Sequence, residues 1–159
     1  MKVLARKATP EQKRILYQAS FAICEKLKID LPKTRVIQIT LKNLEDVDGQ
    51  TWTYDNVIYI DIDYGLASYP SQMFEVLAHE LVHARQYING DFHFVRKKEH
   101  WKGSPIPVNH NMIDQVLQLP SKEYKNLPWE KEAYKIAGQL LTKHLRPFIL
   151  NWKKTIKKG

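Results

Sequence analysis

The stretch that decides the fold is residues 70–88, which read PSQMFEVLAHELVHARQYI. Pro70 with Ser71 is typical of a helix start, and Asn89-Gly90 is typical of a helix end. Apolar residues recur along the stretch at helical spacing, namely Phe74, Leu77, Leu81, Ala84 and Ile88. The sequence therefore predicts an amphipathic helix over residues 70–88.

The centre of this helix carries the pattern HExxH, formed by His79, Glu80 and His83. Two histidines four residues apart lie on one face of a helix, so their ring nitrogens can converge on one metal ion. Glu80 is rotated by about 100° from His79, so it can accept a proton from water without being a ligand. The alternative is a core helix with two hydrogen-bonded histidines.

A catalytic zinc site usually has three protein ligands, so a third must come from another part of the chain. The downstream candidates are Glu130, Glu132, His93, His100 and His110.

A later helix separates the two glutamates. Pro128 is typical of its start, and Arg146-Pro147 ends it after about residue 144. Glu130 lies at the centre of the apolar face, where a carboxylate costs several kcal/mol unless it is paired, protonated or bound to metal. Glu132 lies on the polar face with Lys135. Glu130 is therefore the predicted third ligand; the alternative is a first-turn glutamate stabilised by the helix dipole.

Further elements complete the predicted fold. Thr9, Pro10 and Gln12 predict a capped helix over residues 10–27. Residues 34–41, 52–54 and 57–62 read as strands, with a hairpin turn at Asp55-Asn56 that favours antiparallel pairing. Residues 91–111 read as a strand or two and an irregular loop, and residues 112–119 as a short helix. We expect an α+β fold: one domain over residues 1–159, with a small, mostly antiparallel sheet packed on the HExxH helix and the ligand-bearing C-terminal helix.

Length and composition restrict the class of protein. A chain of 159 residues and 18.7 kDa suits one domain. Cys24 is the one cysteine, which excludes a disulfide framework and a multi-cysteine zinc finger. The sequence has no apolar stretch typical of a signal peptide or a membrane span. These features predict a reduced setting, the cytoplasm.

The charge is strongly basic. Lys and Arg number 25 and Asp and Glu number 17, a net charge of +8. A basic surface favours acidic partners such as nucleic acid, or it simply keeps the protein in solution. Lysines 153, 154, 157 and 158 are expected to form a basic C-terminal tail from about residue 147. A non-catalytic, basic nucleic-acid-binding protein is therefore an alternative function.

The motifs together resemble a known group of enzymes. HExxH followed by Glu130-Lys131-Glu132-Ala133, an ExxA pattern 47 residues after His83, resembles the zincin-like metallopeptidases with a glutamate third ligand. The longer string from Pro128 to Tyr134, with Trp101-Lys102-Gly103 upstream, resembles small metallopeptidases encoded by phages and prophages. This resemblance implies a single zincin-like metallopeptidase domain in the cytoplasm of a bacterial or phage-infected host cell. Several relatives have Asp or Asn after the alanine, where this chain has Tyr134. A partner for a ligating histidine must then come from elsewhere.

A second resemblance competes with the first. SprT-like DNA-associated proteases also use HExxH, with a third histidine downstream. His100 lies 17 residues after His83, in His100-Trp101-Lys102-Gly103, which is similar to that pattern. The basic charge fits such a protease. In contrast, residues 91–100 do not read as a helix, and no cysteine-based zinc ribbon follows.

Both resemblances imply a hydrolase, a protease that uses one Zn²⁺ per chain on a protein or peptide substrate. In the favoured reading the metal ligands are His79, His83 and Glu130, a metal-activated water is the nucleophile, and Glu80 is the general base. The transition-state stabiliser is left open among Tyr134, His100 and His110. The strand residues Val57, Ile58, Tyr59 and Ile60 are expected to bind substrate backbone in extended form.

Overall fold

The computed structural model describes residues 1–31, 36–95, 98–105 and 124–157. The elements in chain order are β1 (Lys2–Leu4), α1 (Pro10–Lys26), β2 (Val36–Lys42), β3 (Gly49–Tyr54), β4 (Val57–Asp63), the 3₁₀ helix η2 (Tyr64–Ser68), α2 (Pro70–Ile88), β5 (Phe92–Val95), β6 (Lys98–Trp101), β7 (Ser104–Pro105), α5 (Pro128–Lys143) and α6 (Arg146–Lys157). The fold class is α+β, as predicted, with a four-stranded mixed sheet and four α-helices in the described part of the chain.

The prediction of a mostly antiparallel sheet is wrong. The strand order is β1-β2-β4-β3, and β2 is parallel to both β1 and β4. The crossover helix α1 between β1 and β2 allows parallel pairing. The predicted hairpin does exist: β3 and β4 are antiparallel, and both Asp55 (φ 48°) and Asn56 (φ 63°) have the positive φ of a tight hairpin turn. Because β4 inserts beside β2, β3 becomes the edge strand.

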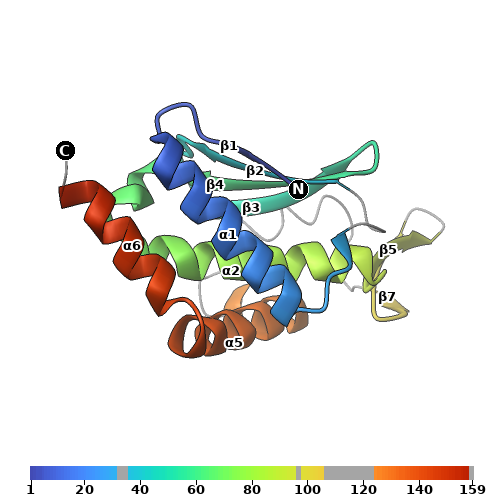
Figure 1. The fold of residues 1–159 in the computed structure, drawn as a ribbon. Coiled ribbons are helices and arrows are strands. Elements are labelled where there is room, and N and C mark those ends of the chain that lie inside the picture. The colour runs from blue at the N-terminus through green and yellow to red at the C-terminus, as the bar shows by residue number, and fades with distance from the viewer. Residues whose placement is uncertain (32–35, 96–97, 106–123, 158–159) are drawn as a thin grey trace.

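Helix α2 occupies the centre of the fold. It contacts β3 and β4 on one side and α1, α5 and α6 on its others. Figure 1 shows the sheet above α2, with α1 and α6 in front and α5 below. Ile58, Ile60 and Ile62 of β4 are fully buried, as are Leu77 and Leu81 of α2. The HExxH helix is therefore held from several directions.

The predicted helices agree closely with α1, α2 and α5. Thr9 and Gln12 form the predicted capping box at the start of α1. The sequence analysis did not predict α6, because it interpreted residues from 147 as a solvated tail. In the structure Trp152 of α6 is fully buried and meets Phe74 edge-on at 6.0 Å. Its indole N–H also donates to the carbonyl oxygen of Ala67 (2.9 Å), so α6 closes one side of the core.

Strands β5, β6 and β7 form a separate antiparallel sheet after α2, where the sequence predicted a strand or two. The predicted short helix over residues 112–119 lies outside the described residues. Among the described helices, none has both the length and the apolar character needed to cross a membrane.

Candidate metal centre

The three predicted ligands come together between α2 and α5. Glu130 Oε2 lies 3.0 Å from His79 Nε2, and Glu130 Oε1 lies 2.8 Å from His83 Nε2. The two histidine Nε2 atoms are 3.2 Å apart. All three residues are buried, and together they could hold a metal ion.

The donor atoms fit a tetrahedral dication. Gln86 Nε2 donates to the carbonyl oxygen of Trp129 (3.0 Å), so Gln86 Oε1 faces His83 Nδ1 at 2.7 Å and accepts its proton. His83 Nε2 then faces a Glu130 carboxylate oxygen at 2.8 Å, so a proton or a metal ion has to lie between them. Two ligands each bound to zinc at about 2.0–2.1 Å in tetrahedral geometry stand about 3.3 Å apart. The observed spacings of 2.8 to 3.2 Å are close to this value.

The electrostatic interactions among His79, His83 and Glu130 favour one positive charge shared by the three side chains. Burial alone would lower the pKa of His83, but its hydrogen bond to Glu130 and the charges of Glu80 and Glu130 raise it to about 9. Burial alone would raise the pKa of Glu130, but hydrogen bonds from His79 and His83 lower it to about 2. Without a metal, the group therefore holds a proton at neutral pH, which a metal ion would displace.

Glu80 lies beside this group, under strand β3. Its side chain is buried, and Thr51 donates its hydroxyl proton to Glu80 Oε2 at 2.6 Å. The strand approaches α2 closely at Gly49, where an added Cβ would lie 2.6 Å from Val76 Cγ1 and 3.1 Å from Glu80 Cγ. Sequence reasoning missed both β3 residues, because Asp48-Gly49 reads only as a turn.

Two tyrosines flank the ligands. Tyr124, which sequence reasoning missed, donates its hydroxyl proton to Glu130 Oε1 at 2.9 Å. The ring of Tyr134 packs edge-on against His79, with centroids 4.4 Å apart. Burial and the neighbouring carboxylate of Glu130 raise the pKa of both phenols, so both are protonated donors at neutral pH. His79 Nδ1 is buried without a hydrogen-bond partner among the described residues.

The two histidine candidates outside the helix do not join the group. His100 lies on β6, opposite His93 of β5, and the ligand group found among the described residues does not include it. His110 lies outside the described residues.

The expected substrate strand has no free edge. The backbone of Val57–Asp63 pairs with β2 on one side and with β3 on the other. The prediction that Val57, Ile58, Tyr59 and Ile60 bind substrate backbone is therefore wrong, because both edges of β4 are already used. In the described sheet the edge beside α2 belongs to β3.

Glu132 is less exposed than its position on the polar face predicted. Only 24% of its side chain is exposed, and it pairs with Arg85 of α2 (3.3 Å) and with Lys102 after β6 (3.2 Å) rather than with Lys135. Burial opposes its ionisation, but the hydrogen bond from Lys102 and the nearby cations lower its pKa. Glu132 thus connects α5 to α2 and to the turn that follows β6.

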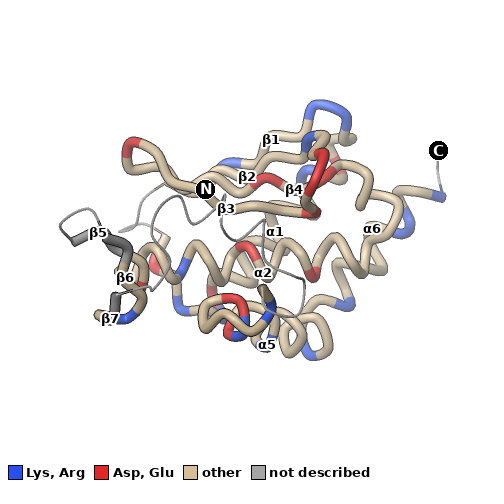
Figure 2. The backbone as a smooth tube through the Cα atoms, turned by 180° about the vertical axis from the view of Figure 1, so that it is seen from behind, with Lys and Arg blue, Asp and Glu red and all other residues tan. Residues whose placement is uncertain are grey.

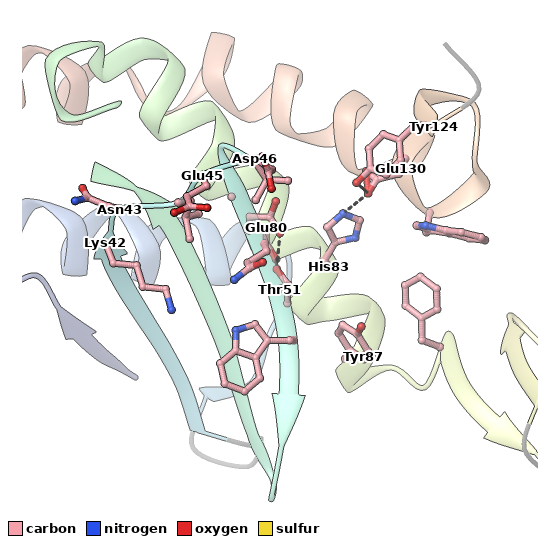
Figure 3. A pocket seen from close by; sticks show the side chains of 17 residues that line it. Lys42, Asn43, Glu45, Asp46, Thr51, Glu80, His83, Tyr87, Tyr124 and Glu130 are labelled. Atoms are coloured by element: carbon pink, nitrogen blue, oxygen red, sulfur yellow. Dashed lines mark hydrogen bonds and ion pairs between the residues drawn. The ribbon is translucent and has the colours of Figure 1, made fainter. Parts of the chain in front are cut away.

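A cleft of about 770 Å³ opens beside the ligand group. Figure 3 shows its walls, which come from the loop after β2, from β3, α2, β5 and α5, and from Tyr124. Glu80, His83 and Glu130 face this space. A molecule in the cleft would therefore reach the candidate metal group, which consists of His79, His83 and Glu130.

Comparison of the chain with protein-family models, curated proteins and solved structures finds no match. The likeness to zincin-like enzymes therefore depends on the two motifs and on the buried cluster of His79, His83 and Glu130, which has the ligand types of an HExxH zinc site.

Proposed function

We propose that the protein is a zinc-dependent metallopeptidase of the zincin-like kind, with His79, His83 and Glu130 as ligands. The observation that carries this proposal is the convergence of three buried donor atoms beside an open cleft, with Glu80 on the same helix facing that cleft. Two histidines and one glutamate are a ligand set of catalytic zinc sites, which leave one position open for water or substrate.

When bound, zinc supplies a Lewis acid that polarises a carbonyl group and lowers the pKa of water toward about 7. Glu80 accepts the proton of the attacking water and later delivers it to the leaving amine. Thr51 holds the Glu80 carboxylate in place from β3. Tyr124, which lines the cleft, donates its hydroxyl proton to Glu130 Oε1 and so holds that ligand in place.

Strand β3 takes the role first expected of β4. It is an edge strand of the described sheet, and Gly49, Gln50, Thr51 and Trp52 all line the cleft. An extended peptide can add to such an edge by main-chain hydrogen bonds, which places its backbone across the metal group.

The proposal is tested with Glu80→Gln. The amide keeps the shape of the side chain but cannot accept a proton, so we expect zinc content near one per chain and a loss of casein hydrolysis of at least a hundredfold. Glu25→Gln, an exposed change on α1, is the matched control and should cleave at the wild-type rate. A Glu80→Gln variant with wild-type activity would show that the general base is another group. A wild-type chain that binds DNA in a salt-sensitive way but holds no zinc would overturn the enzyme proposal.

The third ligand is tested by zinc titration of two variants. Glu130→Ala should lower zinc affinity by several kcal/mol, because it removes one of three protein ligands. His100→Ala should leave zinc affinity unchanged, since His100 lies outside the ligand group. The opposite result would place the protein with the SprT-like proteases.

A further inference from the structure

The cleft beside the metal group has two ends of different chemistry, and α2 runs between them (Figure 3). One end, the aromatic subsite, is formed by Tyr87, Phe92 and Trp129. The other end, the acidic loop, is formed by Glu45 and Asp46 in the connection between β2 and β3. The metal ligands lie between the two.

The aromatic subsite is close to the ligands and rigidly packed. Tyr87 follows His83 by about one turn of α2, and Trp129 directly precedes Glu130 on α5, so each of these two aromatic residues is close to a ligand along its own helix. Phe92 lies between them, with ring centroids 5.4 Å from each. Trp101 supports the group from behind, 5.0 Å from Phe92. A bulky side chain next to a bond held at the metal group can therefore reach these rings.

The opposite end is negatively charged although the whole chain is basic. In the described part of the chain, five Lys, Arg, Asp or Glu residues line the cleft, and four of them are acidic: Glu45, Asp46, Glu80 and Glu130. The fifth, Lys42, is paired with Asp61 at 3.3 Å. A bound dication would offset two of the four carboxylates, which leaves the lining unfavourable for a polyanion and favourable for a cationic segment.

Part of the basic charge lies away from the cleft. Figure 2 shows Lys and Arg on α6 and in the loop between β1 and α1, at the end of the molecule opposite β5–β7. The net charge of +8 therefore does not describe the cleft.

We propose that the cleft takes polypeptide segments in which a bulky apolar side chain and a basic side chain flank the scissile bond. The apolar side chain lies in the aromatic subsite, and the basic side chain faces Glu45 and Asp46. This inference depends on the proposed peptidase function, because it assigns the substrate class of the same site.

Eight synthetic peptides test the proposal with the full, zinc-loaded chain. They carry Phe or Ala on one side of the central bond and Lys or Glu on the other, in both orders. We expect kcat/KM to be at least roughly tenfold higher for Phe than for Ala, as for the filling of an apolar pocket. Lys should exceed Glu by a few-fold, and this preference should shrink at high salt because the acidic loop is exposed.

Variants assign each preference to its end of the cleft. Tyr87→Ala should reduce the Phe-over-Ala ratio, and the double change Glu45→Gln with Asp46→Asn should abolish the Lys-over-Glu ratio. The matched controls are Tyr17→Ala and Glu25→Gln, exposed on α1, which should leave both ratios unchanged. The loop variant changes only exposed side chains, so it remains a test even if Tyr87→Ala fails to fold. Equal ratios in variants and controls would overturn the assignment.

Binding separates this inference from the proposed function. Glu80→Gln, loaded with zinc, is titrated with the same peptides, and tryptophan fluorescence reports on Trp129 in the subsite. Cleavage of casein and of all eight peptides at equal rates would overturn the substrate class and leave the peptidase function intact. Selective binding without any cleavage by the zinc-loaded wild type would support the substrate class and overturn the peptidase function.

Discussion

Gln86 decides which nitrogen of His83 faces the metal group. It is fully buried, accepts the Nδ1 proton of His83 and donates to the carbonyl oxygen of Trp129. A single amide therefore fixes a ligand on α2 and the backbone next to a ligand on α5. The sequence could not identify this residue, because a glutamine three positions after a histidine has no distinctive pattern.

Gln86→Leu should weaken zinc binding by about ten- to a hundredfold, the usual effect of losing a hydrogen bond to a ligating histidine. It should also lower the free energy of unfolding by about 1–3 kcal/mol, because it removes the buried hydrogen bonds of Gln86 to His83 and to the carbonyl of Trp129. Competition with a fluorescent chelator measures the affinity. Gln18→Leu, exposed on α1, is the control. Unchanged zinc affinity in Gln86→Leu would mean that His83 needs no such orientation.

At the scale of elements, the contact of β3 with α2 positions Glu80. Gly49→Ala would place a Cβ 2.6 Å from Val76 Cγ1, so the strand must shift away from the helix. We expect a loss of stability of about 1–3 kcal/mol and a larger loss of peptidase activity, since the contact between Thr51 and Glu80 is disturbed. Thermal unfolding and casein hydrolysis measure the two effects.

Gly138→Ala is the matched control, because an added Cβ there has no neighbour within 4 Å. Alanine in this helical position should stabilise the protein by roughly 0.5–1 kcal/mol and leave activity unchanged. Equal behaviour of the two alanine variants would show that the close approach at Gly49 has no role.

Periodicity and caps predicted the helices well, whereas strand neighbours required the structure. The 3.6-residue pattern located α2 and α5 and placed Glu130 on the buried face, because each helix has one apolar side. The two-residue period of β4 identifies its faces but not the strands beside it, so the mixed order could not be predicted. Arg146-Pro147 was interpreted only as the end of a helix, although proline is equally suited to the first turn of the next.

At the scale of the whole molecule, the metal group links the folding of α2 and α5 to pH. Without metal, the raised pKa of His83, from 6.5 to about 9, contributes stability that is complete below pH 6.5 and lost as the pH rises to 9. The lowered pKa of Glu130, from 4.5 to about 2, contributes stability that is present above pH 4.5 and lost below it. The metal-free protein should therefore be most stable between about pH 4.5 and pH 6.5.

The free energy of unfolding of chelator-treated protein should fall between pH 6.5 and pH 9, by up to about 1.4 kcal/mol for each unit of pKa shift. The melting temperature, measured across this range, should fall with it. Zinc-loaded protein should not show this fall, because the metal takes the place of the proton and its binding strengthens as the proton leaves. Glu130→Gln, which removes the carboxylate, should also lack it. Identical pH profiles with and without chelator would exclude a zinc site in the folded state.

The packing of Trp152 has a consequence for the order of events during synthesis. Every residue of the metal group and the cleft leaves the ribosome before α6 does, yet Phe74 of α2 gains its indole neighbour only when Trp152 arrives. Until then, the end of α2 opposite the aromatic subsite has an uncovered apolar face. A nascent chain thus carries His79, His83 and Glu130 while α2 is still only partly supported, and α6, which follows them in the chain, completes that support.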